Sequence, residues 1–153
     1  ELRSKDHDYA VTGPKIALGG DTEYYAHCAA VWSRSSEQLH QLCAANGIRY
    51  FHFLQPNQYV AGSRPAMSDE ERRLIYHEHY SAKAPVEQGY PLLQLEGERL
   101  ASRGVPFFDL TGLFVDQSER IYRDHCCHFT DLGNEILATR IGEIVLESIA
   151  GDR

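Results

Sequence analysis

A short stretch near the C-terminus carries the side chains best suited to acid–base chemistry. A carboxylate, two imidazoles and two thiols occur on five consecutive residues, namely Asp124, His125, Cys126, Cys127 and His128. A helix is predicted to begin directly afterwards, because Thr130 can cap it and an apolar stripe follows. A histidine at such a junction suits a general base, since a nearby carboxylate fixes the tautomer of its ring and stabilises the imidazolium.

The same stretch could instead bind a metal ion, with His77 and His79 as further ligands. However, the four consecutive residues from His125 to His128 can hardly reach one tetrahedral ion, and structural zinc sites favour paired ligands separated by two to four residues. A solvated helix face is the better interpretation of His77 and His79. Cys126 and Cys127 are interpreted as packing residues, because a nucleophilic thiol needs a depressed pKa. The sequence therefore favours an acid–base pair over a metal site and implies no cofactor.

The bulk composition restricts the possible functions. A chain of 153 residues fits a single domain. Its formal net charge of −7 speaks against non-specific binding to nucleic acid or to anionic membranes, which both require a basic surface. No apolar run approaches the roughly 20 residues that span a bilayer, so no transmembrane segment is predicted. The four cysteines are too unevenly placed for a disulfide scaffold.

The chain divides into an N-terminal tail or linker, residues 1–20, and part of one α/β domain, residues 21–153. Hydrophobic periodicity and capping signals predict helices at 21–46, 68–80, 90–104 and 131–149. Aromatic and β-branched runs predict strands at 48–54 and 105–110. Helices that alternate with short buried strands indicate a parallel sheet covered on both faces.

Several local signals refine these predictions. Asp21 is a plausible N-cap, Ser68 and Glu71 have the spacing of a capping box, and Pro91 suits the first turn of a helix. The inward face of the first helix should carry apolar and small residues at three- and four-residue steps: Cys28, Val31, Trp32, Leu39, Leu42 and Cys43. The last helix should bury Leu137, Ile141, Ile144 and Val145.

Sites in parallel sheets form beyond the carboxyl ends of the strands. The segments after Leu54 and Leu110 should therefore meet at one edge of the sheet, and the loop with Asp124 and His128 follows the second of them. Three amide side chains after the first strand could donate to an acyl or sugar group, or could simply form turns: Gln55, Asn57 and Gln58. His52, inside the strand, is interpreted as a hydrogen-bonded core histidine.

The pattern Asp-x-x-x-His-Phe-Thr-x-x-Gly-Asn from Asp124 to Asn134 resembles the last sequence block of the SGNH (GDSL-type) esterases. Segments 32–36, 50–59 and 104–111 are also similar to members of that family. The resemblance spans roughly residues 22–149 and the C-terminal half of the family's domain. It implies a three-layer, flavodoxin-like α/β fold with a parallel sheet, and a Ser-His-Asp triad in which His128 is the base and Asp124 orients it.

The sequence departs from the family pattern in two respects. The family's Gly-Asp-Ser turn and oxyanion-hole blocks are not recognisable, and Gly20-Asp21-Thr22 is the nearest match to that turn. Asp124 and His128 are four residues apart, whereas three is usual in the family. The resemblance thus implies the C-terminal portion of a serine esterase or deacetylase, inactive alone, with its serine outside this chain.

The expected substrate is a small-molecule or glycan ester. The expected partner is the N-terminal half of the same domain or another copy of the chain. A non-catalytic α/β module that binds a ligand or partner at the same edge of the sheet is the alternative.

Overall fold

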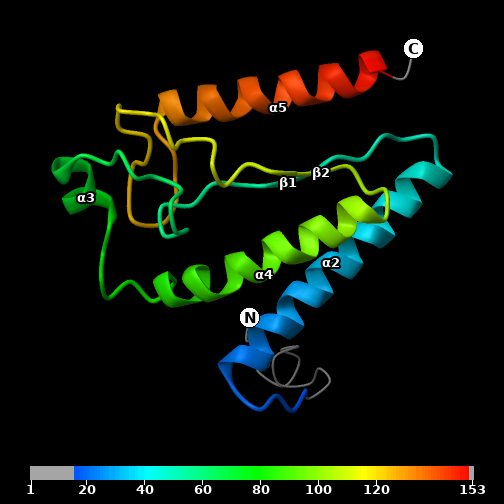
Figure 1. Ribbon diagram of the computed structural model, residues 1–153, viewed down its shortest axis with the longest axis horizontal. Coiled ribbons are helices and arrows are strands. Elements are labelled where there is room, and N and C mark those ends of the chain that lie inside the picture. The colour runs from blue at the N-terminus through cyan, green and yellow to red at the C-terminus, as the bar shows by residue number, and fades with distance from the viewer. Residues whose placement is uncertain (1–15, 152–153) are drawn as a thin grey trace, which may run out of the picture.

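Two short parallel strands lie at the centre of the computed structural model, which describes residues 16–151 (Figure 1). The elements along the chain are α2 (Asp21–Ala45), β1 (His52–Leu54), α3 (Asp69–Ile75), α4 (Lys83–Ser102), β2 (Phe107–Asp109) and α5 (Asp131–Gly151). The strands pair in parallel, with His52 opposite Phe107 and Leu54 opposite Asp109. The predicted parallel pairing is confirmed. The predicted tail falls largely on residues 1–15, outside the described part, and residues 16–20 form no helix or strand.

The strand pair lies between α5 on one side and α2 and α4 on the other (Figure 1). The α/β class is therefore compatible with the structure, while the larger sheet of a flavodoxin-like fold stays a prediction, because the described residues contain two strands. Both strands are shorter than predicted, since only the three residues of each that face the other strand are paired. Within residues 16–151, no helix has the length and apolar character that a membrane crossing needs.

Helix α2 turns a different face inward from the one predicted. Its buried residues are Ala29, Ser33 and Ser36, whereas apolar side chains expected in the core are exposed: Val31, Leu39 and Leu42 at 41%, 49% and 61%, and Cys28 as well. Small side chains let α2 approach α4 closely, and Trp32 reaches over them to the rings of His52 and Phe107. The face of α2 that packs inward is therefore the one with the small residues Ala29, Ser33 and Ser36.

Helices α3 and α4 differ from the prediction at their ends. Ser68 caps α3 as predicted and accepts a hydrogen bond from the Glu71 amide at 3.1 Å. The helix ends at Ile75 because Tyr76 is extended, so His77 and His79 lie exposed in a connector and not on a helix face.

Helix α4 begins at Lys83 and contains Pro91 in its interior, so Pro91 does not start it. The proline is tolerated because it and Glu87, whose carbonyl loses its helical donor, are both exposed to water.

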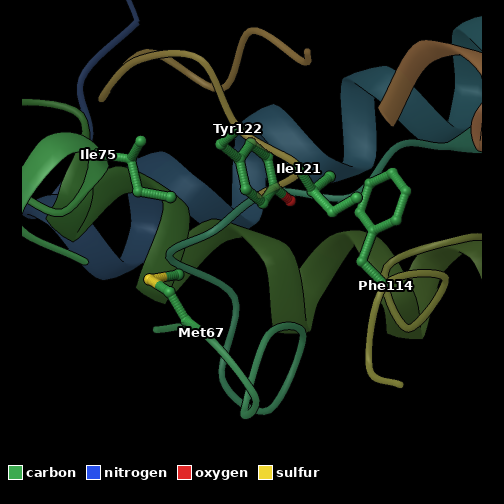
Figure 2. Close-up of a cluster of buried hydrophobic side chains, with 5 residues drawn as sticks. All are labelled: Met67, Ile75, Phe114, Ile121 and Tyr122. Carbon is green, nitrogen blue, oxygen red and sulfur yellow. The ribbon is translucent and has the colours of Figure 1, made fainter. Parts of the chain in front are cut away.

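The main hydrophobic cluster comes mostly from connecting segments, together with Ile75 at the end of α3 (Figure 2). It consists of Met67, Ile75, Phe114, Ile121 and Tyr122, each at most 9% exposed. Partly buried side chains from the neighbouring loops and from α5 pack around it: Leu113, Phe129, Ile136 and Leu137. In α5, Ile144 is buried as predicted, whereas Leu137, Ile141 and Val145 are half-buried. Two members of the cluster, Ile121 and Tyr122, come just before Asp124 in the sequence and so tie the candidate site to the core.

Two glycines of α4 allow a matched test of helix-to-strand packing. A Cβ atom at Gly97 would lie 2.2 Å from the ring of Phe107, while one at Gly89 would meet nothing within 4 Å. We expect Gly97→Ala to destabilise the protein by about 1–3 kcal/mol, because the ring must move. Gly89→Ala should stabilise it by about 0.5–1 kcal/mol through helix propensity. Urea unfolding midpoints measure both, and equal effects would contradict this packing.

His52 is hydrogen-bonded, as predicted, and is half-buried rather than in the core. Its Nδ1 lies 2.5 Å from the hydroxyl of Ser36, which is also 3.1 Å from the hydroxyl of Tyr50. The ring packs on Trp32, with ring centres 4.6 Å apart. This burial lowers the pKa of His52 below its ordinary value.

The lowered pKa predicts acid sensitivity. Below the ordinary histidine pKa of about 6.5, the unfolded chain binds a proton that the folded protein does not. The free energy of unfolding therefore decreases as the pH is lowered. We expect His52→Gln to flatten the loss of unfolding free energy between about pH 7.5 and 5.5, a window around that value. The exposed His79→Gln serves as the control. An unchanged slope in His52→Gln would contradict the prediction.

Candidate active site

A tight hairpin carries the candidate residues to the surface. The 121–130 hairpin is closed by an antiparallel bridge between Tyr122 and Phe129. Its backbone hydrogen bonds run from the Arg123 amide to the His128 carbonyl and from the Thr130 amide to the Ile121 carbonyl, both at 2.8 Å. His128 accepts the inner of these bonds and Asp124 follows Arg123 directly, so their backbone positions are fixed relative to each other.

Within the hairpin, the carboxylate of Asp124 holds the ring of His128. His128 Nδ1 lies 2.7 Å from Asp124 Oδ2, inside the range of about 2.6–3.2 Å expected for such a pair. Asp124 Oδ1 accepts from the amides of Cys126 and His128, at 2.8 and 3.4 Å. The His128 ring, followed by these amides, lowers the pKa of Asp124. An ionised carboxylate only accepts hydrogen bonds, so Nδ1 is the protonated nitrogen.

The four-residue spacing of Asp124 and His128 is accommodated by an unusual turn. Cys127 has φ of 64°, which makes it the one non-glycine residue with positive φ in the described part of the chain. This left-handed residue directly precedes His128. The contact between Asp124 and His128 is therefore compatible with this spacing.

The pair borders a pocket beyond the carboxyl end of β1. The pocket has a volume of about 530 Å³ and is lined by Gln55, Arg123, Asp124, Cys127, His128, Phe129 and Asn134. Gln55 directly follows β1, which puts the pocket at the edge where parallel sheets form their sites. The His128 side chain is 67% exposed. With Nδ1 bonded to Asp124, Nε2 is the nitrogen available to a group in the pocket.

The start of α5 packs directly against the hairpin. Thr130 caps the helix as predicted: its hydroxyl accepts from the Gly133 amide at 3.2 Å and donates to the Arg120 carbonyl at 3.1 Å. A Cβ atom at Gly133 would lie 2.8 Å from the Ile121 carbonyl oxygen. Only glycine lets the first turn of α5 lie this close to the hairpin.

A buried ion pair that the sequence did not reveal anchors the other side of the hairpin. Arg64 and Glu71, each 1% exposed at the side chain, are joined at 2.8 Å. Arg64 also donates to the carbonyls of Gln117 and Glu119. Glu71 Oε1 accepts from the Ile121 amide at 3.0 Å. The sequence indicated only the capping-box role of Glu71, since no local pattern signals a contact fifty residues away.

The other candidates take separate places. Gln58 donates to the Asp124 carbonyl at 3.3 Å and so supports the site from behind, whereas Asn57 forms a turn by accepting from the Tyr59 amide. His125 is exposed, as expected, and packs beside His77 and Tyr80. It does not line the pocket of His128.

Neither a metal site nor a threonine nucleophile is supported. No group of three or more His, Cys, Asp or Glu within residues 16–151 could hold a metal ion. Thr22, of the Gly20-Asp21-Thr22 turn, lies in the first turn of α2, and the start of α2 is far from the start of α5 in Figure 1. Gly20, not Asp21, is the N-cap of α2, and no side chain caps that end.

Comparisons of the chain with protein-family models, with curated proteins and with solved structures found no match.

The buried pair predicts a specific effect on the hairpin. Glu71→Gln keeps an acceptor for the Ile121 amide but leaves the charge of Arg64 buried and unpaired. Removing one partner of such a pair costs about 3–5 kcal/mol, and we expect faster hydrogen exchange at the Ile121 amide as well. The neighbouring, exposed Glu70→Gln is the control and should change stability by less than about 0.5 kcal/mol. Indistinguishable unfolding midpoints of the two variants would exclude this role of Glu71.

Proposed function

We propose that Asp124 and His128 are the acid and the base of a Ser-His-Asp triad in a carboxylic ester hydrolase. The observation that carries the proposal is the 2.7 Å contact of Asp124 with Nδ1 of an exposed histidine at the edge of a pocket. A base in such a triad uses its Nε2 nitrogen while a carboxylate holds Nδ1. The hairpin presents both groups in this arrangement without any further change.

The proposed chemistry needs a serine from outside the described residues. No serine or threonine within residues 16–151 hydrogen-bonds to His128. In the proposed reaction, Nε2 takes the proton of a serine hydroxyl as its oxygen attacks the ester carbonyl, and then returns it to the leaving alcohol. Asp124 stabilises the imidazolium meanwhile. Water releases the acyl group in a second step that uses the same base.

The lining of the pocket suits an ester substrate. The amide side chains of Gln55 and Asn134 can donate to oxygen atoms of an acyl group or of a sugar, and Phe129 provides an apolar wall. Gly133 and Asn134 belong to the sequence block that resembles the SGNH esterases. Gly133 allows α5 to lie close to the hairpin, and Asn134 lines the pocket.

A longer protein that contains this chain and a nucleophilic serine tests the proposal. We expect it to hydrolyse p-nitrophenyl acetate and the chain alone to show negligible turnover. Asp124→Asn should lower kcat by about 10⁴-fold through the wrong tautomer. His128→Ala should lower it by about 10⁶-fold through loss of the base. His125→Ala is the matched control, because that exposed ring lies outside the pocket. It should leave kcat/KM nearly unchanged.

The outcomes separate the two classes of function. Normal turnover by Asp124→Asn would show that the pair is not part of a triad. Comparable turnover by the chain alone would place the nucleophile within it. A longer protein that binds esters or glycans without hydrolysing them, and whose binding survives His128→Ala, would instead be the non-catalytic module.

A further inference from the structure

The two neighbouring thiols at the tip of the hairpin have no part in the proposed hydrolysis. Cys126 and Cys127 are both unpaired and occupy the positions between Asp124 and His128. Cys126 is exposed, while Cys127 is half-buried and lines the pocket of His128. The two side chains therefore meet different surroundings, although their backbones are joined by one peptide bond.

Cys126 lies beside a proton donor at the open side of the hairpin. The hydroxyl of Tyr80 donates to Cys126 Sγ at 3.1 Å. This hydrogen bond, together with burial, raises the pKa of Tyr80 to about 12, so the phenol keeps its proton at neutral pH. A small pocket of about 280 Å³ adjoins it, lined by His77, Glu78, His79, Tyr80 and His125. Cys126 is exposed and accepts this hydrogen bond, so a peroxide can reach its sulfur from solvent.

Cys127 is placed to act second. Burial raises the pKa of its thiol, which protects it from direct oxidation. Its left-handed backbone, with φ of 64°, is unfavourable for a side chain with a Cβ atom. A disulfide would require a rearrangement of the tip that brings the Cys127 sulfur to bonding distance of Cys126.

We propose that Cys126 and Cys127 are a peroxide-sensitive dithiol that controls the Asp124–His128 pair. The Cys126 sulfur attacks one oxygen of hydrogen peroxide, the O–O bond breaks, and the sulfur becomes a sulfenic acid as water leaves. The Cys127 thiol then attacks that sulfur, its proton leaves with the hydroxyl group as a second water, and a disulfide forms. The two thiols lose two electrons in total, and the peroxide gains them.

The disulfide would act on the site through the backbone. Asp124 Oδ1 accepts from the amides of Cys126 and His128, which belong to the peptides on either side of the one that joins the two cysteines. A disulfide between adjacent cysteines changes the backbone angles of both residues, so these flanking peptides shift and their bonds to Asp124 weaken. The hydrogen bond of Tyr80 to Cys126 is lost at the same time. Oxidation therefore frees the carboxylate from the arrangement that orients His128. Reduction by a dithiol restores it.

The other two cysteines provide an internal control. Cys28 and Cys43 both lie on α2, fifteen residues apart, which corresponds to about 22 Å along a helix. A disulfide needs Cα atoms within about 7 Å, so this pair cannot form one. Cys28→Ser/Cys43→Ser should therefore leave the response to peroxide unchanged.

Mass spectrometry of the tryptic peptide 124–140, which contains both thiols, tests the proposal directly on the intact protein. After peroxide treatment and trapping with N-ethylmaleimide, we expect this peptide to lose the mass of two hydrogen atoms and take up no label. Dithiothreitol should restore two labels. Cys126→Ser and Cys127→Ser should each abolish the loss, and Tyr80→Phe should slow it several-fold. The ring-proton NMR signals of His128 should shift on oxidation and return on reduction.

Other products would overturn the proposal. Stable sulfinic acid at Cys126 of the unsubstituted protein, cross-linked chains on a non-reducing gel, or an unlabelled peptide in Cys126→Ser would each exclude the disulfide. A disulfide that leaves the His128 signals unchanged would exclude its control of the site. None of these readouts depends on ester hydrolysis, so the result stands apart from the test of the proposed function.

Discussion

The buried contact between Arg64 and Glu71 is the constraint on which the described site depends. Each of its side chains is 1% exposed, and together they bond to the backbone of the segment before the hairpin. A buried charge left without its partner is costly, so the loop around Arg64, the start of α3 and the chain entering the hairpin must come together at once. The pair thereby joins three segments that no regular sheet or helix connects.

Stability and chemistry are separated within this arrangement. The bond between Asp124 and His128 lies at an exposed tip, where such contacts contribute little to the free energy of unfolding. The rigid parts are below it: the cluster around Phe114, Ile121 and Tyr122, and the close approach of Gly133. In the proposed reaction, an exposed pair that is held by buried segments can meet a substrate and still keep its geometry.

The parts of the fold that the sequence predicted correctly depend on local physical rules. The caps at Ser68 and Thr130 follow from hydroxyl groups three residues before an amide, and the parallel strands from the alternation of helices with apolar runs. The predicted inward face of α2 and the predicted place of Pro91 at a helix start were wrong, because both depend on what packs against each helix. The ion pair of Arg64 and the core built from loops join distant segments and leave no periodic pattern.

The left-handed residue at the tip, Cys127, belongs both to the turn that holds the Asp124–His128 pair and to the proposed dithiol. Glycine adopts such a conformation without penalty, whereas a residue with a Cβ atom pays about 1–2 kcal/mol in it. Cys127 occupies that position in a stretch where Asp124 must reach the ring of His128 across four residues. A glycine would satisfy the turn at lower cost but would remove the second thiol. The proposed disulfide would explain why a strained cysteine, and not a glycine, occupies this position. In that proposal the hairpin holds Asp124 against His128 when the thiols are reduced and loosens this contact when they are oxidised.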